Sequence, residues 1–198
     1  MTPQATPNLV RDFGTFAGAP RRATIDDAGQ LGAVHLAAWR ETYAGIVPDA
    51  MLAGLSVEAR AAMWAKILGN PSSFAETAVY VIEEDASMVG FGACGRQRDS
   101  HLKELGFDAE ISAIYVLRSR QCRGIGRALM AEMATDLRTR VNEAAALWVL
   151  RENAAARAFY QRLGGEVVAE KEDRREHVNL LEIAYGWRKL PVLRRPLL

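Results

Sequence analysis

Cysteine and histidine are scarce in this chain. Its 198 residues include 2 cysteines and 3 histidines. Two cysteines do not make the disulfide framework that small secreted proteins use, and His35, His101 and His177 lack the short spacing of metal ligands. The sequence therefore predicts no disulfide scaffold and no metal site, and we expect a reducing, cytoplasmic location.

An excess of one charge sign and long apolar runs are also missing. The net charge is +1, so we expect no long-range attraction to nucleic acid or to an acidic membrane. No apolar run approaches the ~20 residues that span a bilayer, and residues 1–19 lack the basic start and apolar stretch of a secretory signal. We expect a loosely ordered extension over 1–19, one α/β domain over 20–190, and a tail over 191–198.

The most informative segment runs from Glu110 to Met130. A β-branched apolar run ends at Leu117, a basic loop with Gly124 and Gly126 follows, and apolar residues then recur at helical spacing. Glycine lets the backbone approach a ligand, and the first N–H groups and the dipole of a helix favour a phosphate. The loop also carries Arg120, Arg123 and Arg127. This pattern predicts a pyrophosphate site, and a helix start with incidental glycines is the alternative.

Two common phosphate motifs do not fit this segment. A P-loop requires Lys and then Ser or Thr after its last glycine, whereas Gly126 is followed by Arg127 and Ala128. A dinucleotide fingerprint requires a third glycine where this chain has Leu129. The sequence therefore argues against a nucleotide-binding oxidoreductase.

The segment Gln121–Gly126 resembles the Gln/Arg-x-x-Gly-x-Gly/Ala signature of the GNAT superfamily, the acyl-coenzyme A-dependent N-acyltransferases. Ile114–Leu117 is similar to that family's fourth strand, and Trp148–Gly164 is similar to its second conserved motif. Arg22–Pro48 and Glu182–Trp187 resemble its first strand and helix and its last strand. The resemblance therefore spans about residues 20–190.

The resemblance implies an α/β GNAT fold, with a mixed, mostly antiparallel sheet of about seven strands that splits after strand four and is flanked by helices. We expect strands near residues 21–24, 78–82, 88–97, 109–117 and 145–150, then a terminal hairpin whose solvated tip is 171–176. Helices are expected to end near residue 42 and to occupy about 49–54, 56–68, 124–140 and 153–163.

The same resemblance implies acetyl-CoA as co-substrate. The expected binding residues are Ile114, Tyr115, Val116, Gln121, Cys122, Arg123, Gly124, Ile125, Gly126, Arg127 and Asn153. The backbone of residues 114–116 would pair with the pantetheine arm, and the N–H of Ile114 would face the thioester oxygen. Asn153 would cap its helix and contact the pantetheine.

Two residues are candidate catalysts. Tyr160 matches the family's tyrosine beside the coenzyme sulfur, and a phenol is a suitable proton donor to a leaving thiolate; an amphipathic core aromatic is the alternative. Glu110 is the candidate base at the head of the fourth strand, with a water chain or a merely solvated carboxylate as alternatives.

The resemblance implies an N-acetyltransferase that moves the acetyl group from acetyl-CoA to a primary amine by direct attack, without an acyl-enzyme. Trp39, Tyr43 and Trp64 are candidates for the acceptor pocket, although aromatics at this spacing are also typical of a core. A polyamine, an amino acid, an antibiotic amine and a protein N-terminus all stay open as acceptor, as do a larger acyl group and a homodimer. The alternative function is a CoA-binding sensor or regulatory module without catalysis.

Overall fold

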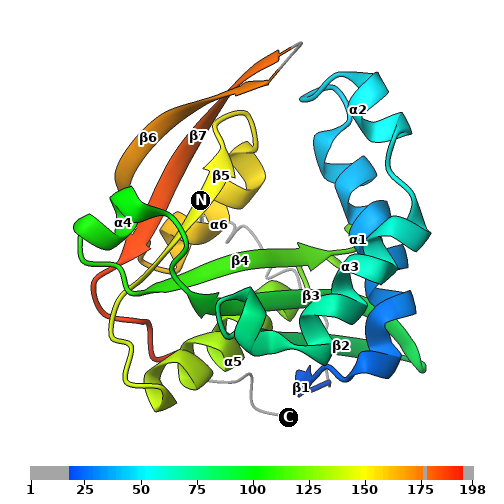
Figure 1. Ribbon diagram of the computed structural model, residues 1–198, viewed down its shortest axis with the longest axis horizontal. Helices are drawn as coiled ribbons and strands as arrows, with labels where there is room; N and C mark the ends of the chain where they lie inside the picture. The colour runs from blue at the N-terminus through cyan, green and yellow to red at the C-terminus, as the bar shows by residue number, and fades with distance from the viewer. Residues whose placement is uncertain (1–17, 176–177, 194–198) are drawn as a thin grey trace, which may run out of the picture.

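A mixed seven-stranded sheet forms the centre of the molecule (Figure 1). The computed structural model describes residues 18–175 and 178–193. The strands are β1 (Arg21–Arg22), β2 (Ala78–Glu84), β3 (Ser87–Arg96), β4 (Ala109–Val116), β5 (Ala145–Leu150), β6 (Glu166–Arg175) and β7 (Val178–Trp187). Their order is β1-β2-β3-β4-β5-β7-β6, and only the β4–β5 pair is parallel. This arrangement confirms the predicted sheet.

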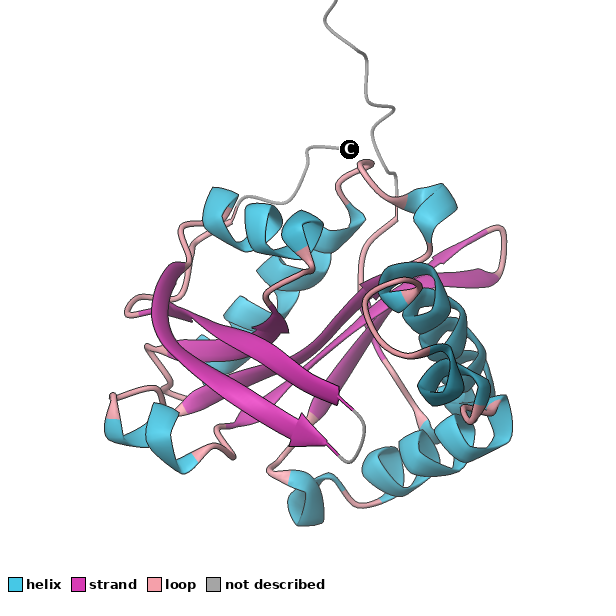
Figure 2. Cartoon of the chain, turned by 90° about the horizontal axis from the view of Figure 1, so that it is seen from above, coloured by secondary structure: helices cyan, strands magenta, loops and turns pink. Residues whose placement is uncertain are grey.

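Helices cover both faces of the sheet (Figure 2). They are α1 (Ala28–Tyr43), α2 (Asp49–Ala53), α3 (Val57–Gly69), α4 (Ser100–Glu104), α5 (Ile125–Thr139) and α6 (Ala154–Arg162). On one face α1 and α3 pack against β2 and β3, where Leu31 meets Val81 and Phe91. On the other face α5 buries Leu129 and Met133 against β2 to β5. Each such side chain contributes about 1.5–3 kcal/mol of burial free energy, so both faces of the sheet are firmly covered.

Polar residues set the helix boundaries where the sequence predicts them. The Ser56 hydroxyl accepts a hydrogen bond from Ala59 N at 3.1 Å, and the Asn153 side chain accepts one from Ala156 N at 3.1 Å. The backbone N–H of Thr24 donates to the Asp27 carboxylate at 2.7 Å, just before α1. These bonds satisfy N–H groups that have no partner within the helix.

The central feature for function is the separation of β4 from β5. The two strands pair only at Ala109–Ala145 and Glu110–Ala146. Beyond these pairs β5 follows β7, whereas β4 follows β3 as far as the Gly90–Val116 pair. Ser112 is the extra residue of a β-bulge, because Ala93 pairs with Ala113 and Cys94 with Ile111. The later part of β4 therefore has an unpaired edge inside the sheet.

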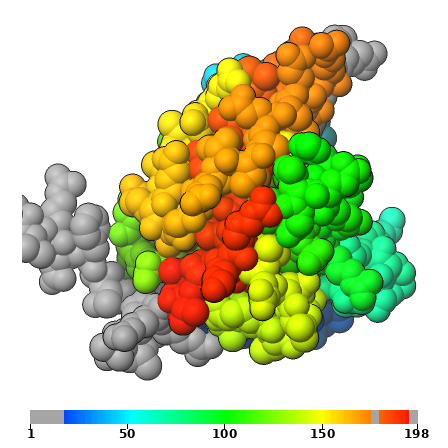
Figure 3. All heavy atoms as spheres, turned by 90° about the vertical axis from the view of Figure 1, so that its left-hand side faces the viewer, coloured from blue at the N-terminus to red at the C-terminus, as the bar shows by residue number. Residues whose placement is uncertain are grey.

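Two details of the predicted secondary structure are corrected. Helix α4 was not predicted; Asp99 caps it by accepting a hydrogen bond from Leu102 N at 3.2 Å. Residues 171–175, predicted as a solvated hairpin tip, belong to β6 and pair with β7. The long hairpin lies beside α4, as the space-filling view also shows (Figure 3). The predicted extension over 1–17, the end of the tail over 194–198 and residues 176–177 lie outside the described residues.

Candidate functional site

A cleft of about 990 Å³ opens where β4 and β5 separate. Its walls come from the second half of β4, the turn that follows, the start of α5, strand β5 and the inner face of α6. Ile114, Tyr115 and Val116 supply the β4 wall. The structure thus brings the first and second predicted motifs together across one cavity, although they lie about thirty residues apart in the sequence.

The turn between β4 and α5 presents a row of backbone N–H groups. The chain makes a 3-10 turn at Arg118–Arg120, and Cys122 and Gly124 then adopt positive φ angles of 60° and 87° before α5 begins. The first bond of the helix joins Ala128 N to Gly124 O at 2.9 Å. Among the described residues, no acceptor binds the N–H groups of residues 122–127. Successive N–H groups in such a turn form an anion-binding concavity.

The two loop glycines have different structural reasons. Gly124 needs a left-handed conformation that side chains rarely adopt, although a Cβ there would meet open space. Gly126 has an ordinary φ angle, but a Cβ would lie 3.2 Å from the Phe159 ring of α6. Gly126 therefore allows the start of α5 to approach α6 closely. This packing explains the glycine at position 126 without any bound ligand.

The arginines of the loop do not all face the cleft. Glu84, at the end of β2, accepts a hydrogen bond from Arg123 at 3.1 Å and lies 2.8 Å from Arg120 Nε. Arg120 and Arg127 line the cleft, whereas Arg123 does not. In the part of the chain that the structure describes, Arg127 has no ion-pair partner and is exposed. Of Arg120, Arg123 and Arg127, Arg127 is thus the one whose guanidinium is available to a bound anion.

Gln121 and Asn153 are occupied by local hydrogen bonds. The Gln121 amide donates to Val116 O at 3.0 Å, so this side chain folds back over the end of β4. The Asn153 side chain caps α6 and also lines the cleft. The capping bond alone accounts for asparagine at position 153, and its contact with pantetheine stays a prediction.

Tyr160 is a buried phenol on the α6 wall of the cleft. Its side chain is 8% exposed and its ring packs against Phe159, Tyr185 and Trp187. Burial, with a smaller effect of Tyr43, raises the pKa of Tyr160 well above its ordinary value near 10. No described residue forms a hydrogen bond with its hydroxyl, and because its pKa is raised the phenol keeps its proton.

The profile of the acetyltransferase (GNAT) family matches residues 39–165, which is more than half of the chain. The chain belongs to the GNAT acetyltransferase family. An uncharacterized N-acetyltransferase of Bacillus subtilis, YuaI, is 32% identical over 175 residues, which cover 88% of this chain and 95% of that protein. This level of identity over nearly the whole length agrees with the family match.

Solved structures show the same fold. The PaiA N-acetyltransferase of Thermoplasma acidophilum, in complex with coenzyme A, has a TM-score of 0.67 at 18% identity and covers 87% of this chain and all of that one. YncA of Salmonella typhimurium, a putative acetyltransferase with its cofactor acetyl-CoA, has a TM-score of 0.64 at 19% identity, with 91% and 98% covered. At these identities the likeness concerns the fold of this GNAT chain.

Glu110 lies outside the cleft of this GNAT chain. It pairs with Gly95 of β3 and Ala146 of β5 near the start of β4. Arg98 donates to both carboxylate oxygens, at 2.8 and 2.7 Å. The structure therefore places Glu110 in an ion pair, where both of its carboxylate oxygens accept hydrogen bonds, and not in the wall of the cleft.

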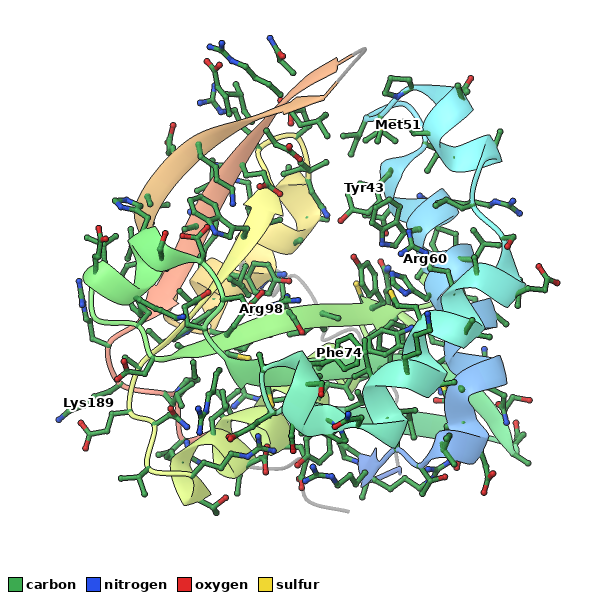
Figure 4. The ribbon with its side chains drawn as sticks, viewed as in Figure 1. Tyr43, Met51, Arg60, Phe74, Arg98 and Lys189 are labelled. Atoms are coloured by element: carbon green, nitrogen blue, oxygen red, sulfur yellow. The ribbon has the colours of Figure 1, made fainter. Side chains whose placement is uncertain are left out.

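A second, smaller cavity of about 160 Å³ adjoins the cleft. Tyr43, Tyr115, Trp148 and Val149 line both spaces, so the two cavities meet at these residues. Trp39 lines the smaller cavity and donates from its indole N–H to the Tyr115 hydroxyl at 2.8 Å. Tyr43 and Met51 extend from α1 and α2 toward the β5–β7 half of the sheet (Figure 4).

Trp64 does not share this position. Its ring is 4% exposed in the core between α3 and β3, and its N–H donates to His35 Nδ1 at 3.1 Å. The prediction that Trp64 lines the acceptor pocket is therefore wrong. Burial lowers the pKa of His35 to about 4, with a smaller contribution from Arg60, so this imidazole is neutral and structural.

Three cavity residues escaped the sequence analysis in this role: the side chain of Tyr115, Trp148 and Glu182. Among the described residues, Glu182 is the only charged one that lines the smaller cavity. One signal was available, because Glu182 interrupts the apolar run Leu180–Ala184 of a strand that crosses the core. Within the described residues, no His, Cys, Asp and Glu side chains group closely enough to hold a metal ion. None of the described helices has the length and apolar character to cross a bilayer.

Proposed function

We propose that this protein transfers the acetyl group of acetyl-CoA to a primary amine by direct attack. The observation that carries the proposal is the row of N–H groups at residues 122–127, for which the described residues supply no acceptor, in a turn that lines a cleft beside the unpaired edge of β4. A row of N–H groups suits a pyrophosphate, and a free strand edge suits the amide-containing pantetheine arm. Bound acetyl-CoA would supply an activated thioester.

The residues that hold the co-substrate follow from these surfaces. The backbone of Cys122, Gly124, Ile125 and Gly126, with the Arg127 guanidinium, binds the pyrophosphate. The backbone of Arg123 belongs to the same row, while its side chain stays with Glu84.

The arm of the co-substrate lies along β4. Ile114, Tyr115 and Val116 pair with it through their backbone, and Gln121 and Asn153 border it. The N–H of Ile114 stabilises the negative charge that develops on the thioester oxygen, an effect worth about 3 kcal/mol in a dry site.

Tyr160 donates the proton that the departing thiolate takes up. Its raised pKa keeps the donor form complete at neutral pH. The amine loses its proton to water, because Glu110 is engaged by Arg98 and does not reach the cleft.

Direct attack agrees with the side chains that border the cleft. Among the described residues that line it, the only thiol is Cys122 and the aliphatic hydroxyls are Thr42 and Ser112. Of the two histidines in the described part of the chain, His35 and His101, neither lines the cleft. The described residues of this wall therefore offer no Ser–His or Cys–His pair, which an acyl-enzyme mechanism needs.

The smaller cavity receives the acceptor, with Trp39 and Tyr43 as walls. It shares Tyr43 with the cleft, and Tyr43 contributes a little to the raised pKa of Tyr160. An amine in this cavity would approach the thioester past Tyr43 and Tyr115, which line both spaces.

Two measurements test the proposal. Calorimetry with acetyl-CoA tests the binding surface, and release of CoA thiol over a panel of amines tests catalysis. Binding together with amine-dependent thiol release is the expected result. Binding without release for every amine would favour the sensor or regulatory module, and no binding by well-folded protein would refute the proposal as a whole.

A further inference from the structure

Glu182 occupies an unusual position in the smaller cavity. Its neighbours in β5 and β6 are Leu150 and Lys171, which lie directly opposite it in the two strand pairs and so share its face of the sheet. The rest of the cavity is lined by aromatic, aliphatic and methionine side chains. The other residues that line it are Trp39, Tyr43, Val47, Met51, Tyr115, Trp148, Val149, Leu150 and Leu180.

Lys171 only partly compensates the charge of Glu182. The Lys171 ammonium lies 3.2 Å from Asp99 Oδ2 and 3.4 Å from Glu182 Oε2, so two carboxylates share one cation. Asp99 is the closer partner, and it also accepts a hydrogen bond from the Trp148 indole at 3.0 Å. Although burial alone would raise the pKa of Asp99, the hydrogen bonds from Leu102, Lys171 and Trp148 lower it. Asp99, Lys171 and Glu182 together thus carry one excess negative charge, and of these three residues Glu182 lines the cavity.

Lys171 also shows what the cavity wall can bind. Its ammonium lies 4.0 Å from the centre of the Trp148 ring, in a cation–π contact that is flanked by the two carboxylates. Lys171 itself does not line the cavity, so this contact lies behind the wall, but it shows that Trp148 and Glu182 together can hold an alkylammonium. Another cation, Arg60, lies behind Trp39 at 5.0 Å from its ring and does not line the cavity.

We infer that Glu182 binds the amino group of the acceptor in its ammonium form, before that group gives a proton to water and attacks, and that the acceptor is a small monoamine with an apolar body. This inference rests on the proposed function. A cavity of about 160 Å³ holds a group of a few heavy atoms, since one water occupies about 30 Å³ in the liquid. A polyamine would leave its further charges against apolar walls, and the carboxylate of an amino acid would face Glu182 in a cavity that no described Lys or Arg lines.

Three probe amines test the chemical class of the acceptor. Isoamylamine is the apolar monoamine, L-leucine is the same body with a carboxylate, and spermidine is the polyamine. The wild-type protein should acetylate isoamylamine with the highest kcat/KM. Calorimetry of isoamylamine against the CoA-loaded protein gives an independent reading of binding. A preference for leucine or spermidine, or no binding of isoamylamine, would overturn the inference.

Two neighbouring substitutions should act in opposite directions. Glu182→Gln keeps the shape and removes the charge, so it should raise the Kd and the KM of isoamylamine about tenfold or more, because an ion-paired hydrogen bond is lost. Lys171→Gln removes the competing cation and should lower both constants several-fold. The KM of acetyl-CoA should not change in either variant, since Glu182 and Lys171 do not line the cleft.

Glu170→Gln is the matched control. Glu170 neighbours Lys171 on β6 but points to the other face of the sheet, where it pairs with Arg151 at 3.1 Å. It should leave the constants of isoamylamine unchanged. Equal constants for Glu182→Gln and the wild type, or shifts of the same sign in Glu182→Gln and Lys171→Gln, would refute the role of Glu182. Acetyl-CoA binding without turnover of any amine would instead refute the proposed function, and the Kd of isoamylamine would still decide on Glu182.

Discussion

Replacing Tyr160 by phenylalanine deletes one hydroxyl from the wall of the cleft and leaves the ring in place. The ring contacts with Phe159, Tyr185 and Trp187 persist. Because no described residue forms a hydrogen bond with the hydroxyl, its removal leaves no buried partner unsatisfied. We therefore expect the free energy of unfolding to change by less than about 1 kcal/mol.

The rate of the chemical step should fall much more. A positioned general acid contributes about 10²–10⁴-fold, which corresponds to roughly 3–5 kcal/mol of transition-state stabilisation. The pKa of Tyr160 lies well above its ordinary value because of burial. The donor is thus fully protonated from pH 6 to 9, and the loss should be nearly independent of pH across that range.

Release of CoA thiol at saturating acetyl-CoA and amine measures kcat, and a single-turnover experiment shows whether chemistry limits it. Tyr185→Phe is the matched control, because Tyr185 is buried beside Tyr160 but does not line the cleft. It should change the rate less than about twofold. If the single-turnover rate of Tyr160→Phe also falls less than about threefold, Tyr160 is not the acid and its place in the motif reflects packing.

Three further results are expected. Glu110→Gln should weaken the ion pair with half-exposed Arg98, cost about 1 kcal/mol or less of stability, and leave the pH profile of kcat/KM unchanged; a selective loss at low pH would show that Glu110 is the base after all. Gly124→Ala puts a side chain on a residue with left-handed backbone, so it should raise the Kd of acetyl-CoA and lower the free energy of unfolding by about 1–2 kcal/mol. Gly29→Ala, at an exposed helical position with open space, should raise the free energy of unfolding by about 0.5–1 kcal/mol. Equal melting temperatures of the two variants would contradict both expectations. Because the folded pKa of His35 is about 4 and the unfolded one about 6.5, the unfolded chain takes up the proton first, and the free energy of unfolding should fall by about 3 kcal/mol between pH 6.5 and 4. Urea titrations at these pH values check this, and His35→Gln should flatten the dependence unless other groups cause it.

The sequence was a good guide to the strand–turn–helix unit and to the helix boundaries, because both depend on local chemistry. Ser56 and Asn153 cap the helices that they were expected to cap. The turn after β4 presents its N–H groups to a cleft, as glycine spacing and the helix start predict. Nearest-neighbour chemistry of this kind is visible in one sequence.

The roles of individual side chains depended on tertiary contacts and could not be predicted. Trp39 and Trp64 are both aromatic residues on helices of the same face, but of the two only Trp39 lines the smaller cavity. Lys171 belongs to a charged stretch that is typical of a solvated turn, and only its pairing with β7 places it opposite Glu182. Glu110 stands at the position expected of a base, and only the structure shows that Arg98 holds both of its oxygens.

The unpaired edge of β4 has a consequence for how the protein behaves at high concentration. The outer borders of the sheet are poor templates for another strand, since β1 consists of Arg21–Arg22 and seven of the ten residues of β6 are charged. The unpaired edge of β4 could accept another strand, but it is enclosed between the two halves of the same sheet, where a folded neighbouring molecule cannot reach it. Strand-to-strand aggregation is thus disfavoured at the outer strands β1 and β6. The cleft beside β4 can still bind a thin, flexible ligand. Binding there should slow the hydrogen–deuterium exchange of the β4 amides.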